Sequence, residues 1–323
     1  MNTPNASSTP GNDAEGAPVA DVTVVMPSHN TGPYVAEALD SIAAQTLRPA
    51  RVVVIDDGST DGGAAIAEQH ALRPTVLRGR FGNAARTRNH AALDAETRWL
   101  AFLDSDDRWL PHHLETAVRS AEQHDAQACV CARIDLDDAT GETNTPAPMA
   151  LEDGAALGDD DFYRVITRPP CEFQTPGLLL ETARFREVGG FDGTQASKHD
   201  LELCMRFFKG VRWVYRREPT WEYRLMRQGS LTNRRVRGFR YMLEAYLKNE
   251  SRWPGPEMRA RIGFHAKRSL GAAVRYGTPD EVEKVWAPAM ERLGLAHRLY
   301  YWAGRRLPGL MRPVSRPPRM SPG

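Results

Sequence analysis

Three carboxylates in one short segment, Leu103-Asp104-Ser105-Asp106-Asp107-Arg108-Trp109, are the side chains best suited to chemistry in this sequence. They follow an apolar run over 99–103 and precede Pro111, which is favoured at the first position of a helix, so the pattern predicts an exposed acidic loop after a buried strand. Carboxylate oxygens suit Mg²⁺ or Mn²⁺, and two of them at i and i+2 leave coordination positions open for diphosphate oxygens. Taken alone, the segment is equally consistent with a solvated turn.

Polar loops also follow two earlier apolar runs. Pro27-Ser28-His29-Asn30 comes after the predicted strand 21–26, and Asp56-Asp57-Gly58-Ser59-Thr60-Asp61 comes after the predicted strand 52–55. Apolar residues at helical spacing predict a helix over 34–45, and a second helix over 84–93 precedes the strand 99–103. Strands that alternate with helices form a mainly parallel sheet, whose strands present their carboxyl ends at one edge. We therefore expect the three loops to converge.

The rest of the chain is organised less regularly. A strand is predicted over 128–134, and an acidic segment with weak periodicity follows over 135–161. Leu201, Cys204, Met205 and Phe208 keep helical spacing, which places Asp200 at the start of a helix that Gly210 closes. Short strands over 211–215 and 221–224 precede Arg-rich helical segments over 238–248, 256–276, 280–293 and 295–306.

Charge is divided unevenly along the chain although the net charge is only +1. There are 18 basic and 32 acidic residues up to Val211, and 24 basic and 9 acidic residues beyond it. No apolar run approaches the roughly 18 residues needed to span a bilayer, and the four cysteines form no CxxC pair, which favours reduced thiols in a cytoplasm. GxGxxG and Walker-type phosphate loops are absent, so hydride transfer and P-loop chemistry are not expected.

Six segments together resemble, in order and spacing, the family 2 glycosyltransferases with a GT-A fold. They are Pro27–Asn30, Asp56–Asp61, Ala85–Asn89, Leu103–Asp107, Val188-Gly-Gly-Phe-Asp192 and His199-Asp-Leu-Glu-Leu-Cys-Met-Arg206. The resemblance, which covers about 21–232, implies an α/β fold and inverting transfer from a nucleoside-diphosphate sugar, with a UDP-sugar favoured. It also implies a catalytic domain over 21–235. The composition of 1–20, which lacks periodicity and a hydrophobic run, predicts a disordered tail, and the Arg-rich helical segments predict a C-terminal extension over 236–323. The catalytic domain would comprise a nucleotide-binding half over about 21–134 and an acceptor half over about 135–235.

The same resemblance assigns roles to single residues. Asp106 would ligate the divalent metal, Mn²⁺ or Mg²⁺, and Asp104 would hold the ribose or a metal-bound water. Asp200 would be the general base that takes the proton from the acceptor hydroxyl, and a bound cation would neutralise the leaving diphosphate. The nucleotide pocket would be formed by Pro27, Ser28, His29, Asn30, Asp57 and Arg88. Asp57 would accept a hydrogen bond from the base, and Arg88 would face the nucleotide.

Two positions depart from the family pattern. His199 stands where the family usually has Glu, so an imidazole could contact the acceptor or the diphosphate. Arg227 lies near the usual His position and could clamp the diphosphate through its planar guanidinium.

Each of these residues also has a structural interpretation. Asp200 could be an N-cap, Asp57 a turn residue and Arg88 a solvated charge or a partner for Asp94. Glu202 and Arg206 are expected to form a surface ion pair of little energetic value. Surface positions are expected for His112, His113, His124 and His265, because none of them has a metal-ligand pattern.

The basic, aromatic segment 295–319 is typical of a helix that lies on a membrane, although packing against the catalytic domain is the preferred interpretation. The expected partners are a nucleotide-sugar donor and a sugar, lipid-linked or small-molecule acceptor. Nucleic acid is not expected, because the acidic half would repel phosphates. The expected location is the cytoplasm, including the inner face of the membrane. A sugar-nucleotide nucleotidyltransferase and a non-catalytic nucleotide-sugar binding module are the alternatives.

Overall fold

The computed structural model describes residues 17–171, 173–225, 235–276, 279–295, 297–298 and 301–302. Its strands are β1 (Val19–Ser28), β2 (Arg48–Asp56), β3 (Thr75–Arg78), β4 (Trp99–Phe102), β5 (Arg108–Trp109), β6 (Ala128–Asp137), β7 (Thr143–Asn144), β8 (Ala156–Leu157), β9 (Leu178–Glu181) and β10 (Trp213–Leu225). Its helices are α1 (Gly32–Ala43), α2 (Gly63–Gln69), α3 (Ala84–Ala92), α4 (His113–Gln123), α5 (Asp159–Thr167), the 3-10 turn η1 (Thr175–Gly177), α6 (Thr182–Glu187), α7 (His199–Phe207), α8 (Arg235–Asn249), α9 (Pro256–Tyr276) and α10 (Pro279–Glu291).

One mixed sheet forms the centre of the fold, with the order β3-β2-β1-β4-β9-β6-β10-β5. β3, β2, β1 and β4 are parallel, as the alternation of strands and helices predicts. β9 lies between β4 and β6 and is antiparallel to both, an insertion that the hydrophobic pattern does not reveal. β10 runs parallel to β6 as a single long strand with a register shift, in place of the two short strands expected.

Helices cover both faces of this sheet, because alternate residues of a buried strand point to opposite sides. Val24 and Met26 of β1 pack in the same core as Leu39 of α1 and Leu114 of α4. Val25, between them, belongs to the opposite core, which includes residues of α3, α5, α6 and α7. The carboxyl ends of β1, β2 and β4 therefore lie at one edge, and the three polar loops follow them.

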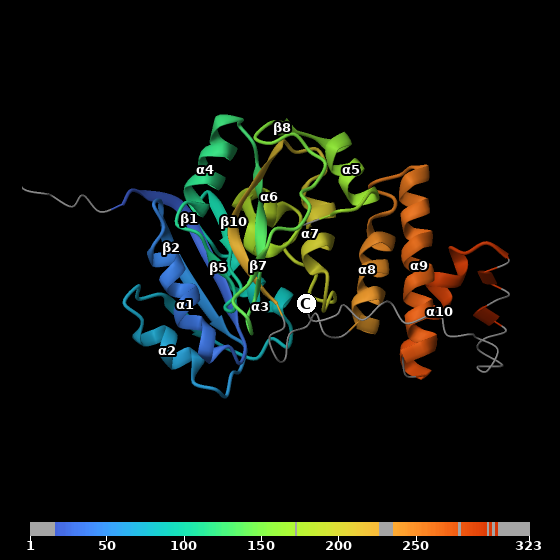
Figure 1. The fold of residues 1–323 in the computed structure, drawn as a ribbon, viewed down its shortest axis with the longest axis horizontal. Helices are drawn as coiled ribbons and strands as arrows, with labels where there is room; N and C mark the ends of the chain where they lie inside the picture. The colour runs from blue at the N-terminus through green and yellow to red at the C-terminus, as the bar shows by residue number, and fades with distance from the viewer. Residues whose placement is uncertain are drawn as a thin grey trace, which may run out of the picture.

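The Arg-rich C-terminal part folds as α8, α9 and α10, which lie in succession beyond α7 (Figure 1). Two hydrogen bonds tie α8 to the sheet domain: Gln195 Nε2 donates to the backbone carbonyl of Tyr241 in α8 at 2.6 Å, and Tyr246 Oη of α8 donates to the carbonyl of Ile166 at 2.6 Å. Within the described residues, no helix is both long enough and apolar enough to cross a bilayer. Most of 295–319 lies outside the described residues.

Two local expectations are wrong. His113 and His265 are 1% and 5% exposed: His113 stacks on the ring of Trp109 and His265 on that of Tyr246, inside the fold. Glu202 is 2% exposed and accepts two hydrogen bonds from the partly buried Arg206, so this ion pair is not a surface pair. The segment 135–161, for which no element is predicted, contains the end of β6, the short strands β7 and β8 and the start of α5.

Candidate active site

The loops after β1 and β2 are bound to each other by short hydrogen bonds. The Asn30 amide donates to Ser59 Oγ at 3.0 Å, and the Thr60 amide donates to Asn30 Oδ1 at 2.9 Å. His29 Nδ1 lies 2.8 Å from the carbonyl of Asp57, and because a carbonyl only accepts, Nδ1 carries a proton. Asn30 holds these loops together and does not line the cavity described below.

Asp61 joins the starts of two helices. Its carboxylate accepts from the amide of Gly32 at the start of α1 and from the amide of Gly63 at the start of α2. Burial alone would raise the pKa of Asp61, but these backbone donors lower it below its usual value. A helix N-terminus stabilises an anion, so Asp61 fixes both helices relative to the loops after β1 and β2.

The carboxylate of Asp57 is directed toward the start of α3. It accepts from the backbone amides of Phe81 and Gly82 and from the hydroxyl of Thr87, 3.1 Å away. The Gly82 amide is shared with the second carboxylate oxygen, so both oxygens of Asp57 accept hydrogen bonds from the protein. Asp57 therefore holds the 79–83 turn in place and lines the cavity at the same time.

The loop after β4 places its three carboxylates in different surroundings. Ser105 is 2% exposed and lies 2.8 Å from the hydroxyl of Thr31, which ties the loop to the start of α1. Asp104 and Asp106 are half-buried and line the cavity. Asp107 instead points inward and accepts from the amide of Arg224, and its pKa is raised well above the usual value by burial and by the neighbouring carboxylates.

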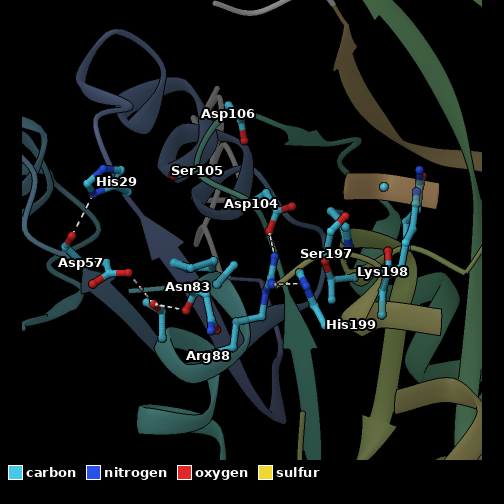
Figure 2. A pocket seen from close by; sticks show the side chains of 18 of the residues that line it. His29, Asp57, Asn83, Arg88, Asp104, Ser105, Asp106, Ser197, Lys198 and His199 are labelled. Carbon is cyan, nitrogen blue, oxygen red and sulfur yellow. Dashed lines mark hydrogen bonds and ion pairs between the residues drawn. The ribbon is translucent and has the colours of Figure 1, made fainter. Parts of the chain in front are cut away.

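Arg88 connects this loop to the segment that carries Asp200. Its guanidinium forms an ion pair with Asp104 Oδ1 and lies 2.7 Å from His199 Nε2, contacts that Figure 2 shows as dashed lines. Arginine only donates, so His199 Nε2 accepts and the ring is neutral with its proton on Nδ1. Burial, followed by the charge of Arg88, lowers the pKa of His199 to about 3. Arg88 itself is 2% exposed, and its ion-pair partner is Asp104 and not Asp94.

Three successive residues of α3 contact four different segments. Thr87 contacts Asp57, Arg88 contacts Asp104 and His199, and Asn89 exchanges two hydrogen bonds with the backbone of Phe191 at 2.8 and 2.9 Å. Gly190, in the same turn, has φ +67° and approaches Asn89 so closely that an added Cβ would lie 2.6 Å from Oδ1. The turn at 188–192 is thereby fixed against α3.

Asp200 is the second residue of α7 and lines the same cavity, half-buried. Its Oδ1 accepts from the amide of Leu201 at 2.8 Å, so one carboxylate oxygen is bound to the helix start. The residue that caps this helix is Lys198, in the left-handed conformation, and not Asp200.

Arg224, at the end of β10, fixes the acidic loop from the other side. Its backbone amide donates to Asp107, and its Nε donates to the carbonyl of Asp106 at 2.9 Å. The guanidinium also pairs with Asp138 and Glu37 and lies 4.7 Å from the centre of the Tyr34 ring. Arg227 lies outside the described residues.

These groups surround one cavity of about 1250 Å³. It extends from Pro27, His29 and Asp57 in the loops after β1 and β2, past Asp104, Asp106 and Asp200, to residues of α8 and α9. Ligand pockets commonly measure roughly 300–1,000 Å³. The cavity therefore has room for more than one small ligand.

The carboxylates fit a divalent cation by the chemistry of their donors. Asp104 gives one oxygen to Arg88, which leaves the second oxygen directed away from that pair, and Asp106 lies two residues further along the loop. Within the described part of the chain, no three His, Cys, Asp or Glu residues gather into a metal cluster. A cation here would need ligands from a diphosphate as well, as hard Mg²⁺ and Mn²⁺ commonly do.

The architecture is that of the GT-A glycosyltransferases. The S. aureus TarS 1–349 structure in complex with UDP-GlcNAc matches 88% of this chain and 87% of its own, with a TM-score of 0.63 and 17% identity. The Pyrobaculum calidifontis mannosyltransferase PcManGT in complex with GDP-Man and Mn²⁺ matches 87% and 83%, with a TM-score of 0.53 and 20% identity. The expected fold class is thereby confirmed.

The amino-acid sequence gives the family. Residues 23–178 match the model of glycosyl transferase family 2, and this part of the chain belongs to that family. Glycosyltransferase GlyG of Streptococcus pneumoniae is 27% identical over 124 residues, 37% of this chain and 41% of GlyG. The first curated relatives are matched over 41%, 58% and 17% of their own length, less than two thirds in each case.

Several residues that build the site carry no distinct sequence signal. Thr87 and Asn89 are uncharged positions in a motif whose charged residues are Arg86 and Arg88. Lys198 precedes the His-Asp pair without belonging to it. Arg224 is part of a Tyr-Arg segment, but its contacts to Asp106 and Asp107 are with residues more than 110 positions away. Only folding reveals these partners.

Proposed function

We propose that this chain is a metal-dependent inverting glycosyltransferase that moves a sugar from a nucleoside-diphosphate sugar to an acceptor hydroxyl. The observation that carries the proposal is the convergence of Asp57, Asp104, Asp106 and Asp200 on one cavity. Complexes of two structural neighbours with UDP-GlcNAc and with GDP-Man and Mn²⁺ support a nucleotide-sugar donor, and the TarS complexes favour a UDP-sugar.

In this proposal the loops after β1 and β2 bind the nucleoside, with Asp57 accepting a hydrogen bond from the base. Asp106, with Asp104, would hold the divalent cation, which supplies positive charge to the leaving diphosphate. Arg88 orients Asp104 through their ion pair, and Asp200 takes the proton from the acceptor hydroxyl. The acceptor oxygen forms its bond to the anomeric carbon as the bond to the diphosphate breaks, so the configuration inverts.

The assignment predicts a specific pattern in one assay. Release of nucleoside diphosphate from UDP-, GDP- and dTDP-sugars is measured with Mn²⁺ and with EDTA. Release from one donor should require the metal and should be lost in Asp106→Asn. Asp200→Asn should lose turnover while nucleotide binding persists. Pyrophosphate exchange would indicate a nucleotidyltransferase instead, and binding without turnover of any donor and acceptor would indicate a binding module.

We further propose a cytoplasmic location, where reduced thiols persist, because all four cysteines are free. If the acceptor is lipid-linked, we also propose that 295–319 contacts the membrane surface.

A further inference from the structure

The cavity has a second wall, formed by α8 and α9, which the proposed donor chemistry does not use. It combines apolar side chains, Phe239, Met242 and Phe264, with the cations Arg261 and Arg268. The acidic residues that line the cavity all come from the loops after β2 and β4 and from α7. The α8–α9 wall is therefore cationic and aromatic, opposite to the acidic donor side.

The two guanidinium groups are held by ring contacts and not by carboxylates. Arg268 lies 4.5 Å from the Phe239 ring centre and 5.5 Å from that of Phe264, and Arg261 lies 5.3 Å from the Phe264 ring centre. Neither forms an ion pair with a described residue, and the one hydrogen bond of Arg261 goes to Tyr246 Oη at 3.4 Å. Stacking on an aromatic ring fixes the guanidinium plane and leaves its N–H groups available to a ligand.

Lys198 adds a third cation beside Asp200. It lines the cavity with φ +60°, a conformation that costs an ordinary residue roughly 1 kcal/mol and that accumulates at functional sites. Its ammonium has no ion-pair partner among the described residues. Figure 2 places it beside His199, on the side of the cavity away from His29 and Asp57.

Resting on the proposed function, we infer that the α8–α9 wall binds an acceptor that carries a phosphate or diphosphate next to its reactive sugar. Phe239 and Phe264 contact the apolar face of that sugar, and Arg261 and Arg268 hold the phosphate oxygens bidentately. Lys198 adds positive charge where the acceptor approaches Asp200. The shared chemistry is a sugar phosphate, whether it is soluble or carried on a lipid.

The test compares binding of neutral and phosphorylated sugars by the full chain. Glucose, galactose, mannose and N-acetylglucosamine are titrated against their 1-phosphates, with the nucleotide side saturated by UDP and Mn²⁺. We expect at least one 1-phosphate to bind about tenfold more tightly than its neutral sugar. Arg261→Gln/Arg268→Gln should abolish this preference, whereas Lys267→Gln, on the same helix but not lining the cavity, should retain it. Equal binding of all pairs, or a preference that survives the double substitution, overturns the inference.

Two further arms separate the outcomes. UDP binding and donor turnover by the chain without substitutions report on the proposed function independently: if both are observed while this chain shows no phosphate preference, only the acceptor inference fails. If Asp106→Asn leaves turnover unchanged while the preference exists, the proposed mechanism fails and the phosphate site stands. Turnover with a sugar on a prenyl diphosphate in detergent micelles, compared with the soluble 1-phosphate, identifies the source of the phosphate.

Discussion

Replacing Arg88 with methionine should damage both stability and turnover, because this side chain bridges two catalytic segments. The side chain of Arg88 is 3% exposed and that of Asp104 is 29% exposed. Removing one partner of a fully buried pair costs about 3–5 kcal/mol. Asp104 can partly rehydrate, so we expect a loss near the lower end, about 3 kcal/mol in the free energy of unfolding.

Turnover should fall further than stability alone explains. Without the guanidinium, Asp104 loses the contact that orients it and His199 Nε2 loses its donor. Loss of a charge-assisted hydrogen bond, about 1.5–3 kcal/mol, corresponds to a roughly 10- to 100-fold decrease in the rate of nucleoside diphosphate release. Arg88→Lys keeps the charge but cannot bond both partners, so it should lie between the wild type and Arg88→Met.

Urea unfolding and the release assay test this reasoning together with an NMR titration of His199. Its pKa of about 3 reflects burial first and the charge of Arg88 second, so it should rise in Arg88→Met. Arg86→Met is the matched control, since this exposed residue of the same helix donates only to the carbonyl of Gly193. Unchanged stability together with turnover within twofold of the wild type would refute the bridging role.

Three further predictions concern stability. His265→Phe should make unfolding less sensitive to acid: burial lowers the pKa of His265 to about 3, so the unfolded state binds more protons between that pH and 6.5. The free energy of unfolding of the variant minus that of the wild type, measured by urea titration, should be about 2 kcal/mol larger at pH 5 than at pH 7.5. The same difference at both pH values would contradict this. Lys248→Met should cost about 1 kcal/mol at pH 7, because Lys248 pairs with the partly exposed Asp192. Burial raises the pKa of Asp192, but hydrogen bonds from Lys248 and Thr194 lower it to about 2. The stabilisation is therefore present above pH 3.8 and lost toward pH 2, and a difference from wild type that does not shrink over that range would refute it. Gly190→Ala should cost about 2 kcal/mol or more, since it adds a clash with Asn89 to the strain of a positive φ. Gly189→Ala, with φ +80° and open space, should show only the strain, and thermal melts that rank the two variants equally would exclude the clash.

The sequence by itself determined the local pattern and the chemistry of the loops. Apolar spacing located α1 and α7 within about two residues of their ends, because a helix buries one face every 3.6 residues. The acidic loop after β4 and the polar loops after β1 and β2 could be placed at one edge, because parallel strands end on the same side. Asp57, Asp104, Asp106 and Asp200 stood out since acidic residues at these positions match a family motif.

The tertiary structure decided which of these groups touch. Arg88 and His199 are 111 residues apart in sequence, and Arg224 and Asp107 are 117 apart, so no local period encodes either contact. The burial of Glu202, His113 and His265 likewise follows from helix packing, which residue type alone does not predict. The α8–α9 wall exists only because α8 packs beside α7, and that juxtaposition depends on long-range contacts such as Gln195 to Tyr241.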